Sequence, residues 1–184
     1  NVPYTIIEAE MKCFSRIINI CQERGYSLSV AMRCPTNSDL YLKELQYFKD
    51  IDKHNYAVYM DNNQEKYTSY CLAFASNIIL SVCSSLLYEM FGYGKKVLFL
   101  GSGSKEMQNS LNCEMIFSKL AEDVCIRSMD KDHIDNKILN LIKKDQNEYL
   151  SDISDSQSYY MNYGKEFAHH IIKERIRSFV YDEC

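Results

Sequence analysis

The chain has 184 residues, a formal net charge of −4, 46% apolar residues and 25% charged residues. This composition is typical of one folded domain and argues against long disorder, and the mild negative charge gives no general attraction to nucleic acid or to an anionic membrane surface. No apolar run approaches the roughly 18 residues of a membrane-spanning helix. The eight cysteines form no C-x-x-C pair, so we interpret the chain as a reduced, cytoplasmic protein.

The N-terminal segment is predicted to form a helix followed by a strand. Apolar residues recur at steps of four and three and define one inward face: Ile7, Met11, Phe14, Ile18 and Cys21. Gly25 is suited to end the helix, because glycine tolerates the left-handed conformation of a C-cap. Residues 28–32 then alternate between larger and smaller side chains, which predicts a strand that Pro35 terminates.

Further helices and strands alternate along the next seventy residues. A capping region at 36–38 precedes a helix over 39–49, with Leu42, Leu45 and Phe48 expected to face inward. The following elements are a strand over 56–60, a turn at 61–63, a helix over 66–74, a strand over 77–82, a helix that starts at Ser84 or Ser85 and runs through Phe91, and a strand over 96–100.

This rhythm predicts an α/β fold, in which a Rossmann-like parallel sheet is flanked by helices. We assign residues 1–128 to this domain, including a fifth strand at 124–127. Residues 129–184 are expected to form a helical C-terminal segment that packs on it. That segment comprises a helix over 130–143, a polar break at 152–156, and a last helix over 163–180.

Ligands of open parallel sheets bind at the carboxyl ends of the strands, so the loops there hold the candidate site. Ser84 and Ser85 follow an apolar strand and begin a helix, where hydroxyl and N–H groups can bind an anion or simply cap the helix. Arg33 could clamp a phosphate or form a surface ion pair. Glu89, one turn further along, could accept hydrogen bonds from sugar hydroxyls or remain a solvated charge.

The glycine-serine loop at 101–104 lacks the complete dinucleotide-binding pattern and the P-loop Lys-Ser pair. Gly101 and Ser102 could contact a ligand through their backbone N–H groups, or serve only as a turn. Cys83 could be proposed as a nucleophile, but no histidine is placed by the sequence to activate it, which favours a packing thiol.

Residues 28–101 resemble the C-terminal, nucleotide-sugar-binding half of GT-B glycosyltransferases, especially the sialyl- and Kdo-transferase-like enzymes of surface-carbohydrate and capsule synthesis. Three segments carry the resemblance. They are SVAMRCP at 29–35, a strand ending in a basic residue and a proline; the helix and strand from Tyr70 to Ser81; and SSLLYEMFGYGKKV at 84–97, with paired serines, a glutamate and a closing G-K-K-V.

The resemblance implies roles for individual residues, but it leaves the catalytic base unassigned. Ser84, Ser85 and Arg33 would hold the donor phosphate, Glu89 would lie near the ribose, and Asn62 and Asn63 would flank the base. Cys34-Pro35 stands where several related transferases carry His-Pro, so the resemblance does not identify the donor as a CMP-sugar. No metal and no cofactor is implied, since the sugar nucleotide is itself the substrate.

By this resemblance the chain is the donor-binding part of a metal-independent glycosyltransferase that moves a sugar from a nucleotide sugar to a surface glycan or polysaccharide. An N-terminal acceptor domain would be missing, which agrees with the abrupt start at Asn1. The expected partners are the donor and a glycan acceptor, with peripheral membrane association and homo-oligomer formation left open. The alternatives are half of a glycerophosphotransferase or sugar-nucleotide epimerase, or a non-catalytic Rossmann-like protein-interaction module.

Overall fold

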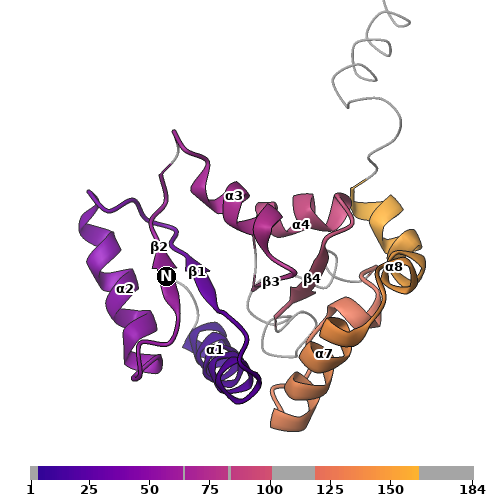
Figure 1. The fold of residues 1–184 in the computed structure, drawn as a ribbon, viewed down its shortest axis with the longest axis horizontal. Helices are drawn as coiled ribbons and strands as arrows, with labels where there is room; N and C mark the ends of the chain where they lie inside the picture. Colours follow the sequence, from indigo (N-terminus) through magenta and orange to yellow (C-terminus); the bar gives the residue numbers. More distant parts are fainter. Residues whose placement is uncertain (1–3, 64, 83, 101–118, 162–184) are drawn as a thin grey trace, which may run out of the picture.

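The computed structural model describes residues 4–161, apart from residues 64, 83 and 101–118. Helices and short parallel strands alternate from Tyr4 to Phe99, and helices follow in the described residues after 118 (Figure 1). This arrangement confirms the predicted α/β class. The elements are α1 (Tyr4–Arg24), β1 (Ser29–Ala31), α2 (Asp39–Ile51), β2 (Val58–Met60), α3 (Thr68–Ala75), β3 (Ile78–Ser81), α4 (Ser85–Gly92), β4 (Lys96–Phe99), the short 3₁₀ helix η1 (Glu122–Val124), α7 (Lys131–Lys143) and α8 (Gln146–Tyr160).

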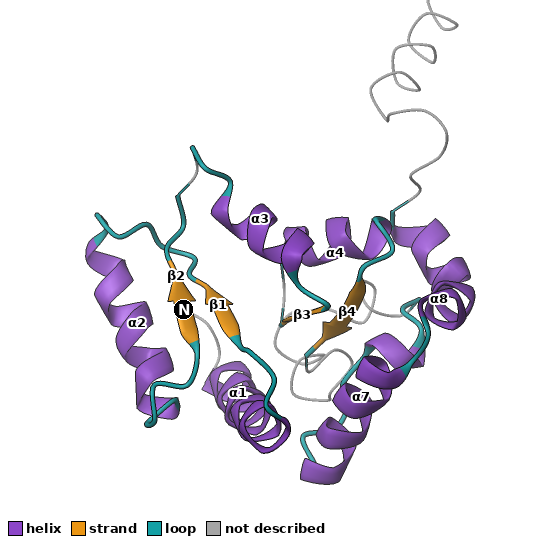
Figure 2. Ribbon diagram, in the orientation of Figure 1, coloured by secondary structure: helices purple, strands orange, loops and turns teal. Residues whose placement is uncertain are grey.

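The strands form two parallel pairs, β1 with β2 and β3 with β4. Val30 lies opposite Tyr59 in the first pair, and Leu80 lies opposite Leu98 in the second. In Figure 2 the arrowheads of β1 and β2 point toward the top, whereas that of β4 points toward the bottom. The described strands therefore do not combine into the single extended sheet of a Rossmann domain, although each pair is parallel as predicted.

Helix α1 packs against both strand pairs through two groups of side chains. Cys13, Ile17 and Ile20 belong to a large core around β4, while Phe14 and Ile18 belong to a smaller core beside β1 and β2. The inward face predicted from the sequence included Phe14, Ile18 and Cys21, and Cys21 packs against the larger core, but the prediction did not include Cys13, Ile17 or Ile20. Met11, expected on that inward face, is 39% exposed, because the helix buries a broad stripe centred nearer to Ile17.

The larger core surrounds β4, whose Val97, Leu98 and Phe99 are fully buried. Helix α8 covers this region with the buried Tyr149, whose hydroxyl donates to the Lys95 carbonyl at 2.9 Å and accepts from the Val97 N–H at 3.2 Å. Tyr149 thus bonds to two backbone groups at the start of β4, one on Lys95 just before the strand and one on Val97 within it. This contact holds the described part of the helical C-terminal segment on the α/β core.

Three sequence predictions about single elements are wrong or incomplete. The expected break at 152–156 lies inside α8, because Tyr149, Ile153 and Ser156 follow helical spacing and are buried while the intervening polar residues face solvent. Leu42, expected to face inward, is 70% exposed. The predicted strand at 124–127 reduces to one parallel bridge between Cys125 and Phe99. The predicted helix over 163–180 lies outside the described residues.

Candidate functional site

The loop that leaves the carboxyl end of β1 is fixed by a carboxylate from the following helix. Glu44 of α2 accepts a hydrogen bond from the Arg33 N–H at 2.8 Å and another from the Cys34 N–H at 2.9 Å. The two acceptor atoms are the two oxygens of one carboxylate, so both amides point toward the same place. The α2 helix can present Glu44 there because it starts only a few residues later, with Ser38 as its N-cap.

The carboxyl ends of β1 and β2 are joined by a second contact. The Asn62 side-chain amide donates to the Arg33 carbonyl at 2.8 Å. This contact follows from the parallel pairing of the two strands, which brings the loops after Ala31 and Met60 to the same end. Arg33 and Asn62, predicted from the sequence to share one site, therefore lie together in the structure.

Asn63 has a local role in the loop after β2. Its side-chain oxygen accepts from the Lys66 N–H at 3.1 Å, and its carbonyl accepts from the Thr68 N–H at 3.3 Å. These bonds shape the turn that leads into α3. The predicted contact of Asn63 with a nucleotide base stays a prediction, whereas its contribution to the turn is visible.

The electrostatics at this end of β1 combine a cation with a carboxylate. The Arg33 side chain is exposed, and the half-buried Glu44 lies against the backbone of the same residue. Partial desolvation, followed by the charge and hydrogen bonding of Glu44, raises the pKa of the Cys34 thiol. Cys34 is therefore held in its neutral form, which does not suit a nucleophile.

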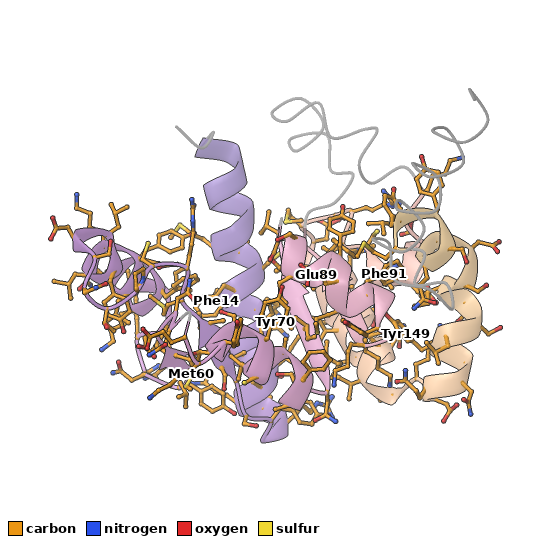
Figure 3. The ribbon with its side chains drawn as sticks, turned by 90° about the horizontal axis from the view of Figure 1, so that it is seen from above. Phe14, Met60, Tyr70, Glu89, Phe91 and Tyr149 are labelled. Carbon is orange, nitrogen blue, oxygen red and sulfur yellow. The ribbon has the colours of Figure 1, made fainter. Side chains whose placement is uncertain are left out.

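The other predicted site residues gather around α4. Ser84 occupies the N-cap position with extended backbone angles and makes no side-chain capping hydrogen bond, and Ser85 is the first helical residue. Glu89 accepts a hydrogen bond from the Tyr70 hydroxyl at 2.7 Å, which links α4 to α3. Figure 3 shows Tyr70 and Glu89 close together near the middle of the view.

The predicted site residues thus fall into two groups. Within the described part of the chain, no hydrogen bond or ion pair links Arg33 or Asn62 to Ser84, Ser85 or Glu89. Gly101, Ser102 and Cys83 lie outside the described residues. The structure brings together one half of the predicted site and places the other half on the neighbouring helix pair.

The sequence did not identify two residues that bond to the predicted ones. Glu44 lies ten or more positions along the sequence from the amides that it binds. The spacing of apolar residues in a helix does not indicate which backbone groups an acidic side chain will bond to. Tyr70 belongs to a segment that carries the family resemblance, but its hydroxyl partner Glu89 comes from another helix. Both contacts depend on how helices pack, which local spacing does not encode.

A shallow hollow of about 480 Å³ lies on a different part of the surface, between η1, α7 and the start of α8. Three of its charged residues, Asp123, Lys137 and Lys144, take part in ion pairs. Lys144 contacts both Asp123 and Asp152, and Lys137 contacts Glu122. We interpret this cluster as a surface ion-pair network that helps to join α7 to η1 and α8.

The fold and the site define an α/β protein of short parallel strand pairs, with polar and charged groups at the carboxyl end of one pair. Comparison by sequence identifies the family: residues 5–175 match a family described as "putative O-antigen biosynthesis protein", and the chain belongs to that family. The match supports a role in surface-glycan biosynthesis. No curated protein and no solved structure matches the chain. Across the described residues, no helix is both long and apolar enough to cross a membrane.

Proposed function

We propose that the chain binds the nucleotide-sugar donor of a glycosyltransferase of surface-glycan biosynthesis. The observation that carries this proposal is the hydrogen bond from the Asn62 side-chain amide to the Arg33 carbonyl, which brings these two residues together at the carboxyl end of the β1–β2 pair. The N–H groups of Arg33 and Cys34 lie at the same end, where Glu44 accepts from both. This is the end at which parallel α/β proteins bind nucleotides. Membership of an O-antigen biosynthesis family supplies the chemical context.

In the proposed reaction, the bond between the anomeric carbon and the donor phosphate oxygen breaks, and the electron pair stays on the phosphate. An acceptor hydroxyl forms the new bond to that carbon and gives its proton to a base that is not among the residues named above. The guanidinium of Arg33 would stabilise the negative charge on the leaving nucleotide, because a fixed cation is most effective where charge develops. Ser84 and Ser85 at the start of α4 would hold the donor phosphate together with Arg33, and Glu89 would lie near the ribose.

The proposal is tested by calorimetric titration of the 184-residue chain with CMP, CDP, UDP and GDP. We expect one nucleotide to bind at micromolar concentration. Arg33→Ala should weaken that binding by about 1.5–3 kcal/mol, the usual contribution of a hydrogen bond to a charged group, and Ser84→Ala combined with Ser85→Ala by about 1–3 kcal/mol.

Arg24→Ala is the matched control, because Arg24 ends α1 and precedes the amino end of β1. It removes the same charge from the opposite end of the strand and should leave the affinity unchanged. If none of the four nucleotides binds and the chain instead associates stably with itself or a protein partner, the interaction-module alternative would replace this proposal. An equal loss in Arg24→Ala and Arg33→Ala would point to a general charge effect and argue against the site.

A further inference from the structure

The carboxylate of Glu44 bonds to two consecutive backbone amides, those of Arg33 and Cys34, at 2.8 and 2.9 Å. Consecutive N–H groups directed at one point form a concavity that binds anions, and phosphate oxygens are frequent occupants of such sites. In this structure an oxygen pair from the protein itself occupies that position. The amide pair therefore already has the geometry to hold an anion, and a side chain fills it.

The amide pair has a support that is independent of Glu44. On the other side of the same peptide segment, the Arg33 carbonyl is held by the Asn62 amide at 2.8 Å. If the Glu44 side chain rotated away, this contact would still restrain the Arg33–Cys34 backbone. The orientation of the two N–H groups toward an incoming anion thus does not require the carboxylate to stay.

The surroundings allow an exchange with solvent. Glu44 is half-buried and Arg33 is exposed, so an anion can approach from the surface and the carboxylate can move into water. Among the described residues, no ion pair engages the Arg33 guanidinium. A phosphate bound to the two amides could also form an ion pair with the Arg33 guanidinium. The Glu44 carboxylate, in its present contacts, bonds to the backbone N–H groups.

We propose that Glu44 is an internal competitor that holds the Arg33–Cys34 amide pair until a phosphate-bearing ligand displaces it. The inference rests on the proposed function for the identity of that ligand, a sugar nucleotide. The effect is to lower the affinity for every anion at this position, because a bound ligand must both displace the carboxylate and tolerate its charge nearby. Only ligands with additional contacts, such as a base or a sugar, would bind well.

The test compares inorganic pyrophosphate binding to the wild-type chain and to Glu44→Gln by calorimetry. Glutamine has nearly the same shape but carries no charge, and only its amide oxygen can accept from the N–H groups. We expect Glu44→Gln to bind pyrophosphate at least fivefold more tightly than the wild type. Glu23→Gln is the control, since Glu23 is an exposed glutamate near the end of α1, and it should leave the affinity unchanged.

A second measurement needs no variant. Titration of the wild-type chain with pyrophosphate should shift the ¹⁵N amide signals of Arg33 and Cys34 together with the side-chain carboxyl ¹³C signal of Glu44. Equal or weaker binding by folded Glu44→Gln, or unshifted amide signals at saturation, would overturn the inference. If Glu44→Gln gains affinity for pyrophosphate but no nucleotide binds to either chain, the competitor role stands and the proposed donor function fails.

Discussion

Asp52 shows how one buried side chain can organise a loop. It lies at the C-cap of α2, is 1% exposed, and accepts hydrogen bonds from the N–H groups of Tyr56 and Ala57 and from the Tyr59 hydroxyl. The three donors belong to the segment that leads into β2 and to β2 itself. A single carboxylate therefore fixes the position of β2 relative to α2, and with it the loop that carries Asn62.

We predict that Asp52→Asn lowers the free energy of unfolding by about 2 kcal/mol, because an asparagine amide group would face N–H donors at a buried position. Urea unfolding followed by circular dichroism measures the change. Asp50→Asn is the matched control, since Asp50 is an exposed residue of the same helix that accepts a hydrogen bond from the Gln46 side chain, and it should change stability by less than about 0.5 kcal/mol. Equal effects of the two substitutions would contradict the role given to Asp52.

The same carboxylate should make stability depend on pH. Burial opposes its ionisation, but the hydrogen bonds from Tyr56, Ala57 and Tyr59 outweigh that effect and lower the pKa of Asp52 below the usual 3.8. Its contribution is therefore complete well above pH 3.8 and is lost as the pH falls through that value toward the lower pKa of the folded state. The stability difference between the wild type and Asp52→Asn should shrink over this acidic range, and a difference that grew there would contradict the assignment.

At single positions, sequence reasoning succeeded where the cause is local. Ser38 lies in the predicted capping region and accepts a hydrogen bond from the Leu40 N–H at 3.2 Å. Leu42 was misplaced because helical spacing identifies an apolar face but does not show how much of it a small core can cover. Asp52 and Glu44 were missed because their partners come from other elements.

Among the elements, the turn between α4 and β4 depends on a glycine that packs against α8. Gly94 has a φ of +75°, and a Cβ there would lie 2.8 Å from the Leu150 Cδ2. The Gln157 side chain of α8 donates to the carbonyls of Phe91 and Gly92, both at 3.0 Å. A methyl group at position 94 would therefore require the Leu150 side chain of α8 to shift.

We predict that Gly94→Ala destabilises the protein by more than Gly25→Ala. Gly25 also has a positive φ, +70°, but a Cβ at that position would have nothing within 4 Å of it. Both substitutions should incur the backbone cost of about 1–2 kcal/mol, and Gly94→Ala a further cost of about 1–3 kcal/mol from overpacking. Thermal unfolding measures both, and equal losses would show that α8 yields to the added methyl group.

Most helices and strands were predictable, because each has its own apolar pattern and stop signals. The failure at α8 is instructive. Asp152, Asp155 and neighbouring serines resemble a loop in composition, yet the helix begins at a proper cap, where Asp145 accepts from the Asn147 N–H at 2.8 Å. Once begun, it continues because Tyr149 and Ile153 are buried on one face. The helical spacing of the buried residues therefore predicted this segment better than its polar composition did.

In the whole molecule, α1 joins the two cores. The neighbouring residues Ile17 and Ile18 are both buried but belong to different clusters. Arg16 lies on the same helix, between the buried Phe14 and Ile17. It forms a bidentate ion pair with Asp135 of α7. Movement of α1 would therefore disturb both strand pairs and α7, which favours cooperative unfolding of the described part of the chain.

We predict that Ile18→Ala lowers the free energy of unfolding by about 2–4 kcal/mol, as is usual for a truncated core isoleucine. Hydrogen exchange should report the loss at the amides of Tyr59 in β2 and of Leu98 in β4, although Ile18 packs only in the smaller core. Met11→Ala, at an exposed position of the same helix, is the control. Faster exchange confined to β1 and β2 would show that the two cores open separately.

The overall architecture was less predictable than its parts. The sequence indicated parallel strands, and each pair is parallel, but local patterns do not determine whether β1 and β3 become neighbours in one sheet. The candidate site shares this limit. Arg33 and Asn62 meet because they follow two strands that do pair, whereas Ser84 and Glu89 follow a strand of the other pair.

The position of α1 also bears on how the chain could be divided. The segment at 61–67 connects the β1–β2 unit to the remainder, and a cut there would leave α1 with the first fragment. The second fragment would then lack the side chains of Cys13, Ile17 and Ile20 that close its own core. The second fragment would have an incomplete core, and the first would expose the same three side chains of α1. This protein is therefore suited to fragment complementation, in which two polypeptides recover a native structure by recombining.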